Sequence, residues 1–265
     1  MVKKKRKKRN TVKAKKNQVK KRRKKREINI EAWIDKYIMD FVSLTGLDTL
    51  GLSKEQYKEL LSDILVDLYG SLTSYSNVKV VAKRYLRARE KINEVIAARL
   101  AFMLNELTPE QLEFIVFNIN VNTALSVVPR IYGFLNRLGR EDLIEILRIK
   151  WRNSWIRKKY DVLPPLCPYC GFNSLMPDLT CLVCGALVNE KDLIRSEEFR
   201  VKFMELVRNL SCEELRALLQ HDIILYNDSE VKPLTQKKLP VDVEIYMPRS
   251  LKNIIRSELR ERCEG

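Results

Sequence analysis

Four cysteines in the second half of the chain have the residue type and the spacing of a metal site. Cys167 and Cys170 form one Cys-x-x-Cys pair, and Cys181 and Cys184 form another after a gap of ten residues. Four thiolates at tetrahedral spacing select zinc over harder cations, and an all-cysteine set leaves no position open for a substrate or an activated water. We therefore predict one structural Zn2+ with these four side chains as its ligands.

A glycine follows each pair, Gly171 after the first and Gly185 after the second, and supplies the left-handed turn that a metal-binding knuckle needs. With these residues, the segment LCPYCGFNSLMPDLTCLVCGALV, here named the cysteine module (166–188), resembles the zinc-ribbon and zinc-knuckle group. The resemblance covers about 23 residues of 265, and its gap is shorter than the roughly 15 to 20 residues of the commonest spacing. CPxCG halves of this kind occur in many nucleic-acid-handling and protein-docking modules. The resemblance implies a metal site and a small pair of β-hairpins.

Two other uses of the four cysteines compete with zinc: two disulfides in an oxidising setting, or an iron site of the rubredoxin type. Zinc is favoured because residues 1–26 lack the apolar core of a secretion signal, which argues for a reducing compartment. The zinc could be only a structural staple, or the module could also form part of a binding surface. Cys212 and Cys263 have no partner in the sequence pattern, so we expect a small packed residue and a free thiol.

Charge is distributed very unevenly along the chain. Seventeen of the 50 basic residues lie in the first 26 positions without one acidic residue, and residues 28–265 carry 33 basic and 33 acidic residues. Such a segment has almost nothing apolar to bury, so we expect a disordered basic arm over residues 1–27. Its natural partner is a polyanion, most simply the phosphates of DNA or RNA, which these residues do not distinguish. Without aromatic side chains the arm can position a nucleic acid but cannot read its sequence. The candidate contacts in the arm are Lys3, Lys4, Lys5, Arg6, Lys7, Lys8, Arg9, Lys20, Lys21, Arg22, Arg23, Lys24, Lys25 and Arg26.

Two further basic segments lie in the body. The segment RIKWRNSWIRKKY (148–160) mixes cations with aromatic rings, and a helix there would place its basic rim beside the cysteine module. In the competing interpretation, its two tryptophans continue an apolar stripe into the core and the cations are merely solvated. A third segment places Lys79, Lys83, Arg87 and Lys91 at near-helical spacing, a pattern that is usually an ordinary solvent face. The candidate nucleic-acid contacts in the second segment are Lys150, Trp151, Arg152, Trp155, Arg157, Lys158 and Lys159.

The elements that must position these residues are mostly helices. Capping boxes at Ser53, Thr108 and Ser211 start three of them. Apolar residues recurring at intervals of three and four predict helices near 30–45, 53–70, 78–105, 108–117, 121–137 and 140–160, and again within 196–219. The segment 241–247 alternates like a strand and precedes a last basic helix.

The fold class expected is mainly α: a multi-helix bundle with a small four-cysteine, zinc-ribbon-like β module and a disordered basic N-terminal arm. The two prolines at 164 and 165 break the helical pattern and suggest a domain boundary at 161–165. The expected domains are the arm (1–27), a helical domain (28–160), the zinc module (161–190) and a C-terminal helical appendage with a short strand (191–265).

Catalytic signatures are missing from the sequence. No Walker loop, no Gly-x-Gly-x-x-Gly and no Gly-x-Ser-x-Gly occurs, and the one histidine, His221, sits at a predicted helix end. We therefore expect a non-catalytic, zinc-containing nucleic-acid-binding protein that works with a protein partner in a larger complex. One alternative is a protein-interaction scaffold with purely structural zinc and a tethering tail, and another is a nuclease built from scattered carboxylates and metal.

The longest uncharged stretch, 114–129, is too short and too polar for a bilayer. We expect a soluble, intracellular protein without a membrane partner, cytoplasmic in a prokaryote or archaeon and nuclear or nucleolar in a eukaryote.

Overall fold

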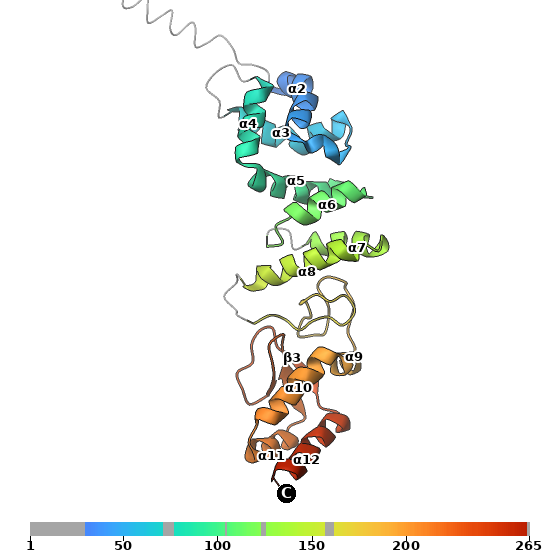
Figure 1. The fold of residues 1–265 in the computed structure, drawn as a ribbon, viewed down its shortest axis with the longest axis vertical. Coiled ribbons are helices and arrows are strands. Elements are labelled where there is room, and N and C mark those ends of the chain that lie inside the picture. Colours follow the sequence, from blue (N-terminus) through green and yellow to red (C-terminus); the bar gives the residue numbers. More distant parts are fainter. Residues whose placement is uncertain (1–29, 71–76, 104, 123–125, 157–161, 264–265) are drawn as a thin grey trace, which may run out of the picture. The chain divides into compact units, whose positions relative to one another are not determined.

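The computed structural model describes residues 30–70, 77–103, 105–122, 126–156 and 162–263 (Figure 1). The expected mainly α fold is confirmed, with one small sheet near the C-terminus. The basic arm lies outside the described residues. The chain divides into two compact units, one that ends at Ile92 and one that runs from Asn93 to Gly265. The break expected at 161–165 falls within the second of these units.

The first unit packs α2 (Ile30–Thr45) against α3 (Lys54–Gly70) and α4 (Val78–Arg87), with a short 3-10 turn, η1 (Leu47–Leu50), between α2 and α3. Phe41 and Tyr85 meet edge to face inside this core, with ring centroids 5.6 Å apart. The predicted capping box at the start of α3 is present, because Ser53 and Gln56 each bond the backbone N–H of the other.

The helix predicted over 78–105 is two helices. α4 ends at Arg87, Ala88 forms a turn, and α5 (Arg89–Met103) begins directly after it. The backbone of Ala88 departs from helical geometry at φ −114° and ψ 19°. α4 packs against α2 and α3, and the division between the two units falls within the residue range of α5.

The second unit begins with helices that pack on α8 (Glu141–Ile156). α6 (Pro109–Asn118) starts at the predicted capping box of Thr108 and Gln111, and α7 (Val128–Arg137) starts with proline in its first turn. Both α6 and α7 lie against α8. α7 begins later than the predicted residue 121, at a position where proline favours the first turn and lacks only an N–H that would be unpaired anyway.

The C-terminal part surrounds a three-stranded antiparallel sheet. It contains α9 (Glu190–Arg195), α10 (Glu197–Asn209), α11 (Cys212–Gln220) and α12 (Arg249–Cys263). The sheet order is β2 (Val231–Pro233), β1 (Ile223–Tyr226), β3 (Val243–Tyr246). The strand predicted at 241–247 is confirmed as β3, and β1 and β2 were not predicted. Phe199 of α10 packs edge to face on Tyr226 of β1, at 5.1 Å between ring centroids.

A buried ion pair joins β2 to the residue that precedes β3. Lys232 lies 3.0 Å from Asp242, and both side chains are almost fully buried. Asn227 donates to the same carboxylate at 2.7 Å, while its own side-chain oxygen accepts from the N–H groups of Ser229 and Glu230. Every hydrogen bond to this carboxylate compensates for the water lost on burial, which keeps an otherwise costly pair in place.

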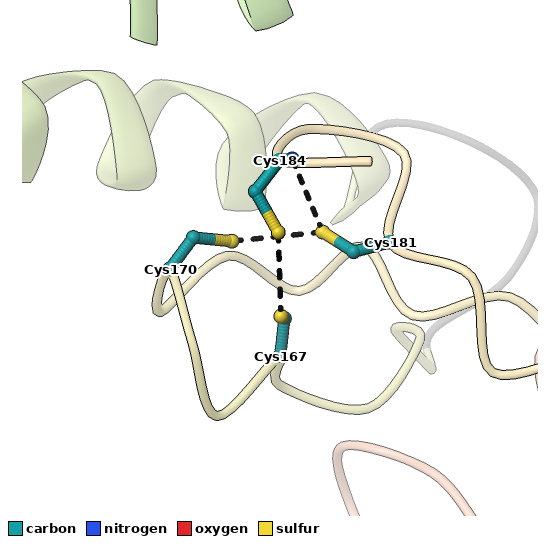
Figure 2. A group of neighbouring side chains, drawn as sticks. All are labelled: Cys167, Cys170, Cys181 and Cys184. Atoms are coloured by element: carbon teal, nitrogen blue, oxygen red, sulfur yellow. Dashed lines mark hydrogen bonds between the residues drawn. The ribbon is translucent and has the colours of Figure 1, made fainter. Parts of the chain in front are cut away.

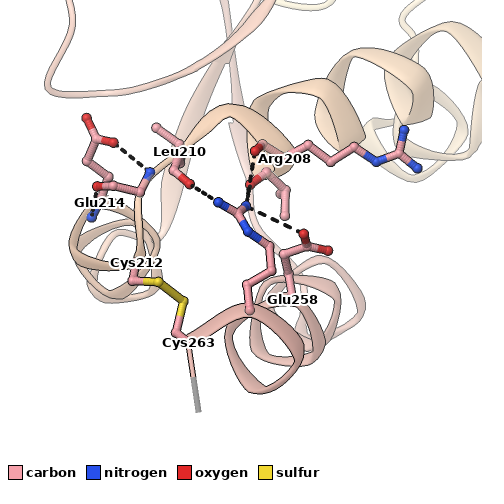
Figure 3. The surroundings of a disulfide bond; sticks show 9 residues. Arg208, Leu210, Cys212, Glu214, Glu258 and Cys263 are labelled. Atoms are coloured by element: carbon pink, nitrogen blue, oxygen red, sulfur yellow. Dashed lines mark hydrogen bonds and ion pairs between the residues drawn. A yellow bond between two sulfur atoms is a disulfide. The ribbon is translucent and has the colours of Figure 1, made fainter. Parts of the chain in front are cut away.

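The expectation that Cys212 and Cys263 are unpaired is wrong. They form a disulfide between the start of α11 and the end of α12, across 51 residues (Figure 3). Arg262 lies beside it and donates to the carbonyls of Arg208 and Leu210, each at 3.0 Å. The end of α12 is therefore attached to the α10–α11 corner by a covalent bond and by a guanidinium that caps free helix carbonyls.

Candidate metal centre

The four predicted ligands converge on one point (Figure 2). Their sulfur atoms all lie within 4.8 Å of one another. The Sγ atoms of Cys170 and Cys181 are 3.6 Å apart, and those of Cys167 and Cys184 are 3.9 Å apart. A tetrahedral ion with sulfur at about 2.3 Å requires sulfur atoms about 3.8 Å apart, so the four residues fit such an ion. Both distances are far longer than the roughly 2.05 Å of a disulfide, and all four cysteines are free, so the structure does not show the two-disulfide alternative.

The two halves of the cysteine module repeat the same backbone bonds. Gly171 donates its N–H to the carbonyl of Cys167 at 2.9 Å, and Gly185 donates to that of Cys181 at 3.0 Å. Both glycines have positive φ, 73° and 71°, as predicted from their position after each pair. Because left-handed geometry costs a side-chain-bearing residue about 1 to 2 kcal/mol, glycine at both places lets the chain fold back and present its thiols.

Hydrogen bonds also reach the sulfur of Cys181. The N–H groups of Val183 and Cys184 lie 3.4 Å from it, and the hydroxyl oxygen of Ser174 lies 3.0 Å from it. The pKa of Cys181 is lowered, because hydrogen bonds from Cys167 and then other neighbours favour its thiolate. The pKa of Cys170 is raised, first by its hydrogen bond with Cys167, so the bonds within the cluster favour the thiolate, the form that binds metal, at Cys181.

The centre is closed to solvent on most sides. Cys167, Cys170 and Cys181 are buried, and only Cys184 is partly exposed. Four thiols around one point with little solvent access could hold a metal ion that keeps no open position. The pairing around it is sparse: single antiparallel bridges join Leu166 to Asn173, Leu175 to Cys181 and Thr180 to Leu187, so each half of the expected hairpin pair is held by isolated bridges. A loop of this kind has little core of its own, so a metal would supply much of its stability.

Arg148 of α8 supports the first knuckle. Its Nε donates to the carbonyl of Cys170 at 3.0 Å, and its guanidinium lies 5.8 Å from the centre of the Phe172 ring. Glu141 and Glu145 of the same helix bind the other side of the guanidinium. The backbone of Gly171 passes so close that an added Cβ would lie 2.8 Å from the Nε of Arg148. This cation therefore lies next to the site at which four thiolates and one divalent ion would leave a net negative charge.

Trp151 connects the same helix to the module. Its indole Nε1 donates to the backbone carbonyl of Asn173 at 2.8 Å, and its ring meets Phe172 edge to face at 6.1 Å. The residue is only 2% exposed. Tyr132 of α7 also packs on Phe172, at 5.5 Å between ring centroids, and burial raises the pKa of its hydroxyl. α7 and α8 thus form the platform on which the module rests.

The module also contacts the C-terminal sheet. Asn173 donates its side-chain amide to Asp228 at 2.6 Å, and the N–H of Asp228 donates to Leu163 at 3.1 Å. Tyr169 donates its hydroxyl to Asp192 of α9 at 2.7 Å. The module therefore joins the α7–α8 pair to the sheet and α9, within one unit.

The described residues of the predicted basic surface beside the module have different surroundings and do not form one exposed surface. Trp151 is a core residue, which agrees with the competing interpretation of this segment. Lys150 directs its ammonium into the C-terminus of α6, donating to the carbonyl of Phe117 at 2.7 Å, and burial lowers its pKa. Trp155 is half-buried beside Trp151, and Arg152 is exposed, 3.8 Å from Asp228. Lys150 thus caps the C-terminus of α6, where carbonyls without a partner in the helix attract a nearby cation.

The remaining candidate contacts lie outside the described residues. They are Arg157, Lys158, Lys159 and the cations of the arm. Their role as nucleic-acid contacts stays a prediction.

Sequence reasoning missed Arg148, Ser174 and Asn173 as partners of the centre. Arg148 follows Glu141 and Glu145 on α8, and such an alternation of charge along a helix is typical of a solvated face. Ser174 and Asn173 lie in the gap between the two cysteine pairs. Short polar side chains often bond to the backbone and side chains of their own loop, so the position of these two residues in the gap was a sequence signal for their contacts near the centre.

Comparison with protein-family models, with curated proteins and with solved structures finds no match to this chain. No helix among the described residues is long and apolar enough to cross a bilayer.

Proposed function

We propose that this is a non-catalytic nucleic-acid-binding protein whose second unit is held together by one structural zinc ion. Zinc is the metal favoured by four thiolates in tetrahedral array. The observation that supports it most directly is the closed cluster of Cys167, Cys170, Cys181 and Cys184. When bound, the ion would crosslink the two knuckles, and no open position would remain on it for a substrate.

Nucleic acid is the proposed partner because of the arm. Its first 26 residues carry 17 cations and no acidic residue, which favours a polyanion, and phosphate contacts of this kind need no defined fold on the protein side. If 6 to 10 of them met phosphates, affinity would fall by about 10³ to 10⁵ between 50 and 200 mM salt. Binding of this kind depends on charge, so it serves DNA and RNA alike.

A second candidate function is a protein-interaction scaffold. The burial of Trp151 and the capping role of Lys150 favour it, because they remove two members of the predicted nucleic-acid surface beside the module.

The metal proposal is tested by native mass spectrometry and by cobalt substitution. We expect one zinc per chain and, with Co2+, the intense visible absorption of tetrahedral thiolate coordination. Cys181→Ser should abolish both, and Cys263→Ser, which changes a cysteine outside the cluster, should preserve both. If the purified protein is red and contains iron, the centre is of the rubredoxin type and not a zinc site. A metal-free, fully folded protein would refute the proposal.

The partner proposal is tested by binding of the full chain and of a chain lacking residues 1–26 to duplex DNA, single-stranded DNA and structured RNA in a salt series. We expect the full chain to bind, with a steep loss of affinity as salt rises. Absence of binding by the full chain at 50 mM salt would refute the proposal and favour the scaffold.

A further inference from the structure

The outward side of α4 carries a row of cations. Lys79, Lys83 and Arg87, here named the α4 stripe, are all exposed and follow one another at intervals of four residues. Residues at this interval lie on one side of a helix. The opposite side faces the core of the first unit, where α4 packs against α2 and α3. The buried residues of α4 are Val81, Ala82 and Tyr85.

The charges of the α4 stripe are not neutralised within the described part of the chain. None of the three side chains forms an ion pair with a residue that the structure describes. Other cations of this unit are paired: Lys58 and Lys54 lie 2.9 and 3.4 Å from Asp35, which lowers the pKa of that carboxyl. The stripe is thus left free to attract an external anion.

The surroundings of the stripe increase this contrast. Residues 30–70 contain eight acidic and three basic residues, whereas residues 77–92 contain six basic residues and one acidic residue, Glu90. Arg84 of α4, which is partly buried and is not part of the stripe, donates to the carbonyl of Leu68 at 3.3 Å. The positive charge of the unit's described residues is therefore gathered on α4 and the start of α5, where it would meet a negatively charged partner.

The length of the stripe fits a nucleic-acid backbone. Eight residues of helix span about 12 Å. One strand of DNA carries a phosphate for every 3.4 Å of its axis, so about three or four phosphates lie along that distance. Three cations on one helix can meet neighbouring phosphates of a single strand, and the helix holds them in a fixed order. Such contacts set the orientation of the protein on the strand without reading its bases.

We propose that the α4 stripe is a phosphate-binding surface for nucleic acid, through which the first unit itself contacts the backbone. This inference rests on the proposed function and adds to it a surface within the folded body. The basic arm directly precedes this unit in the sequence, since α2 begins at Ile30. The arm and the stripe then act on one polyanion, the arm supplying affinity and the stripe a defined orientation.

The test uses the full, zinc-loaded chain with Lys79→Gln, Lys83→Gln and Arg87→Gln combined. Glutamine keeps high helix propensity, so the triple variant should retain the thermal stability of the parent. The matched control combines Lys191→Gln, Arg200→Gln and Lys237→Gln. These three residues are exposed and lie in separate parts of the second unit, and their substitution removes two lysines and one arginine, as in the stripe variant. Binding to a fluorescent duplex and to a single strand is measured by anisotropy from 50 to 300 mM salt.

We expect the stripe variant to bind more weakly and its salt slope, d log K/d log[salt], to become shallower by about 2 to 3, near 0.9 for each lost phosphate contact. The control should keep the parent slope. Equal slopes for the parent and the stripe variant, or an equal change in the control, would overturn the inference while leaving the arm-based function standing. Binding to phosphatidylserine vesicles is measured in parallel. If the stripe variant loses binding to the vesicles but keeps its binding to nucleic acid, the inference is likewise overturned. If the parent chain itself does not bind nucleic acid, the proposed function fails instead.

Discussion

The indole Nε1 of Trp151 and the backbone carbonyl of Asn173 are joined by a hydrogen bond of 2.8 Å. This bond fastens α8 to the loop between the two cysteine pairs. Asn173 in turn bonds Asp228 through its side chain, so one residue of the module connects α8 with the segment after β1. Disturbing this connection should therefore affect the unit as a whole.

Trp151→Phe should lower the free energy of unfolding by about 1 to 3 kcal/mol, because it leaves the buried carbonyl of Asn173 without its donor. Chemical denaturation of the zinc-loaded protein measures the change. Ile149→Ala is the control on the same helix: Ile149 is 52% exposed, and its substitution should change stability by no more than about 0.5 kcal/mol. Equal effects of the two substitutions would contradict a linking role for Trp151.

The two knuckle glycines should respond differently to alanine. Both need positive φ, so each substitution should cost about 1 to 2 kcal/mol. Gly171→Ala should cost more, because its Cβ would collide with the Nε of Arg148, whereas nothing lies within 4 Å of a Cβ at Gly185. Thermal unfolding of the two variants measures the difference.

Arg148→Ala provides the control for that comparison. In its background the collision is gone, so the costs of Gly171→Ala and Gly185→Ala should become similar. A difference that persists without the Arg148 side chain would show that the close approach is not its cause.

Asp228 should make stability depend on pH in the acid range. Burial raises the pKa of its carboxyl above the usual value of about 3.9. The folded state therefore holds the proton more tightly, so this residue favours folding most below the unfolded pKa, and that contribution is lost as pH rises through the folded pKa.

Asp228→Asn removes this titration and keeps a side-chain oxygen for Asn173. Relative to the parent, the variant should gain stability as pH rises from 4 to 7, with no gain at the acid end. Denaturation of both proteins across this range measures the difference, in which the common effect of pH on the metal site cancels. A difference that grows toward low pH would contradict the raised pKa.

Removing the Cys212–Cys263 disulfide should destabilise the second unit by up to about 4 kcal/mol, the chain-entropy value for a loop of this length. Cys263→Ser with the parent as reference measures it. Because Arg262 holds the same end of α12, Arg262→Gln should cost more in the Cys263→Ser background than in the parent. Strictly additive costs would show that the two attachments act independently.

Features that depend on neighbouring residues were predictable from the sequence. The capping boxes at Thr108 and Ser211, the knuckle glycines and the four metal ligands all follow from side chains a few residues apart. Each is decided by local geometry, which a sequence pattern carries directly.

Features that depend on distant parts of the chain were not. Cys212 and Cys263 are 51 residues apart, and only the packing of α11 against α12 brings them together. Lys150 looked like a free cation because its carbonyl partners lie in another helix. The break at Ala88 has no proline or glycine to mark it in the sequence, and α4 packs against α2 and α3, which come from an earlier part of the chain.

The hairpin of β1 and β2 is an intermediate case. Its turn contains Asn227, Asp228 and Ser229 between two apolar segments, which is a recognisable turn signal. The strands are only four and three residues long, and short strands give a weak alternation.

The bond between Cys212 and Cys263 turns the last part of the chain into a covalent ring. All three strands and α12 lie between the two sulfur atoms. The connection from β2 to β3 runs through exposed residues at 234–238, the kind of segment that proteases cut. One cut there would open the peptide chain without releasing a fragment, so the two pieces would migrate as one molecule until a reductant separated them.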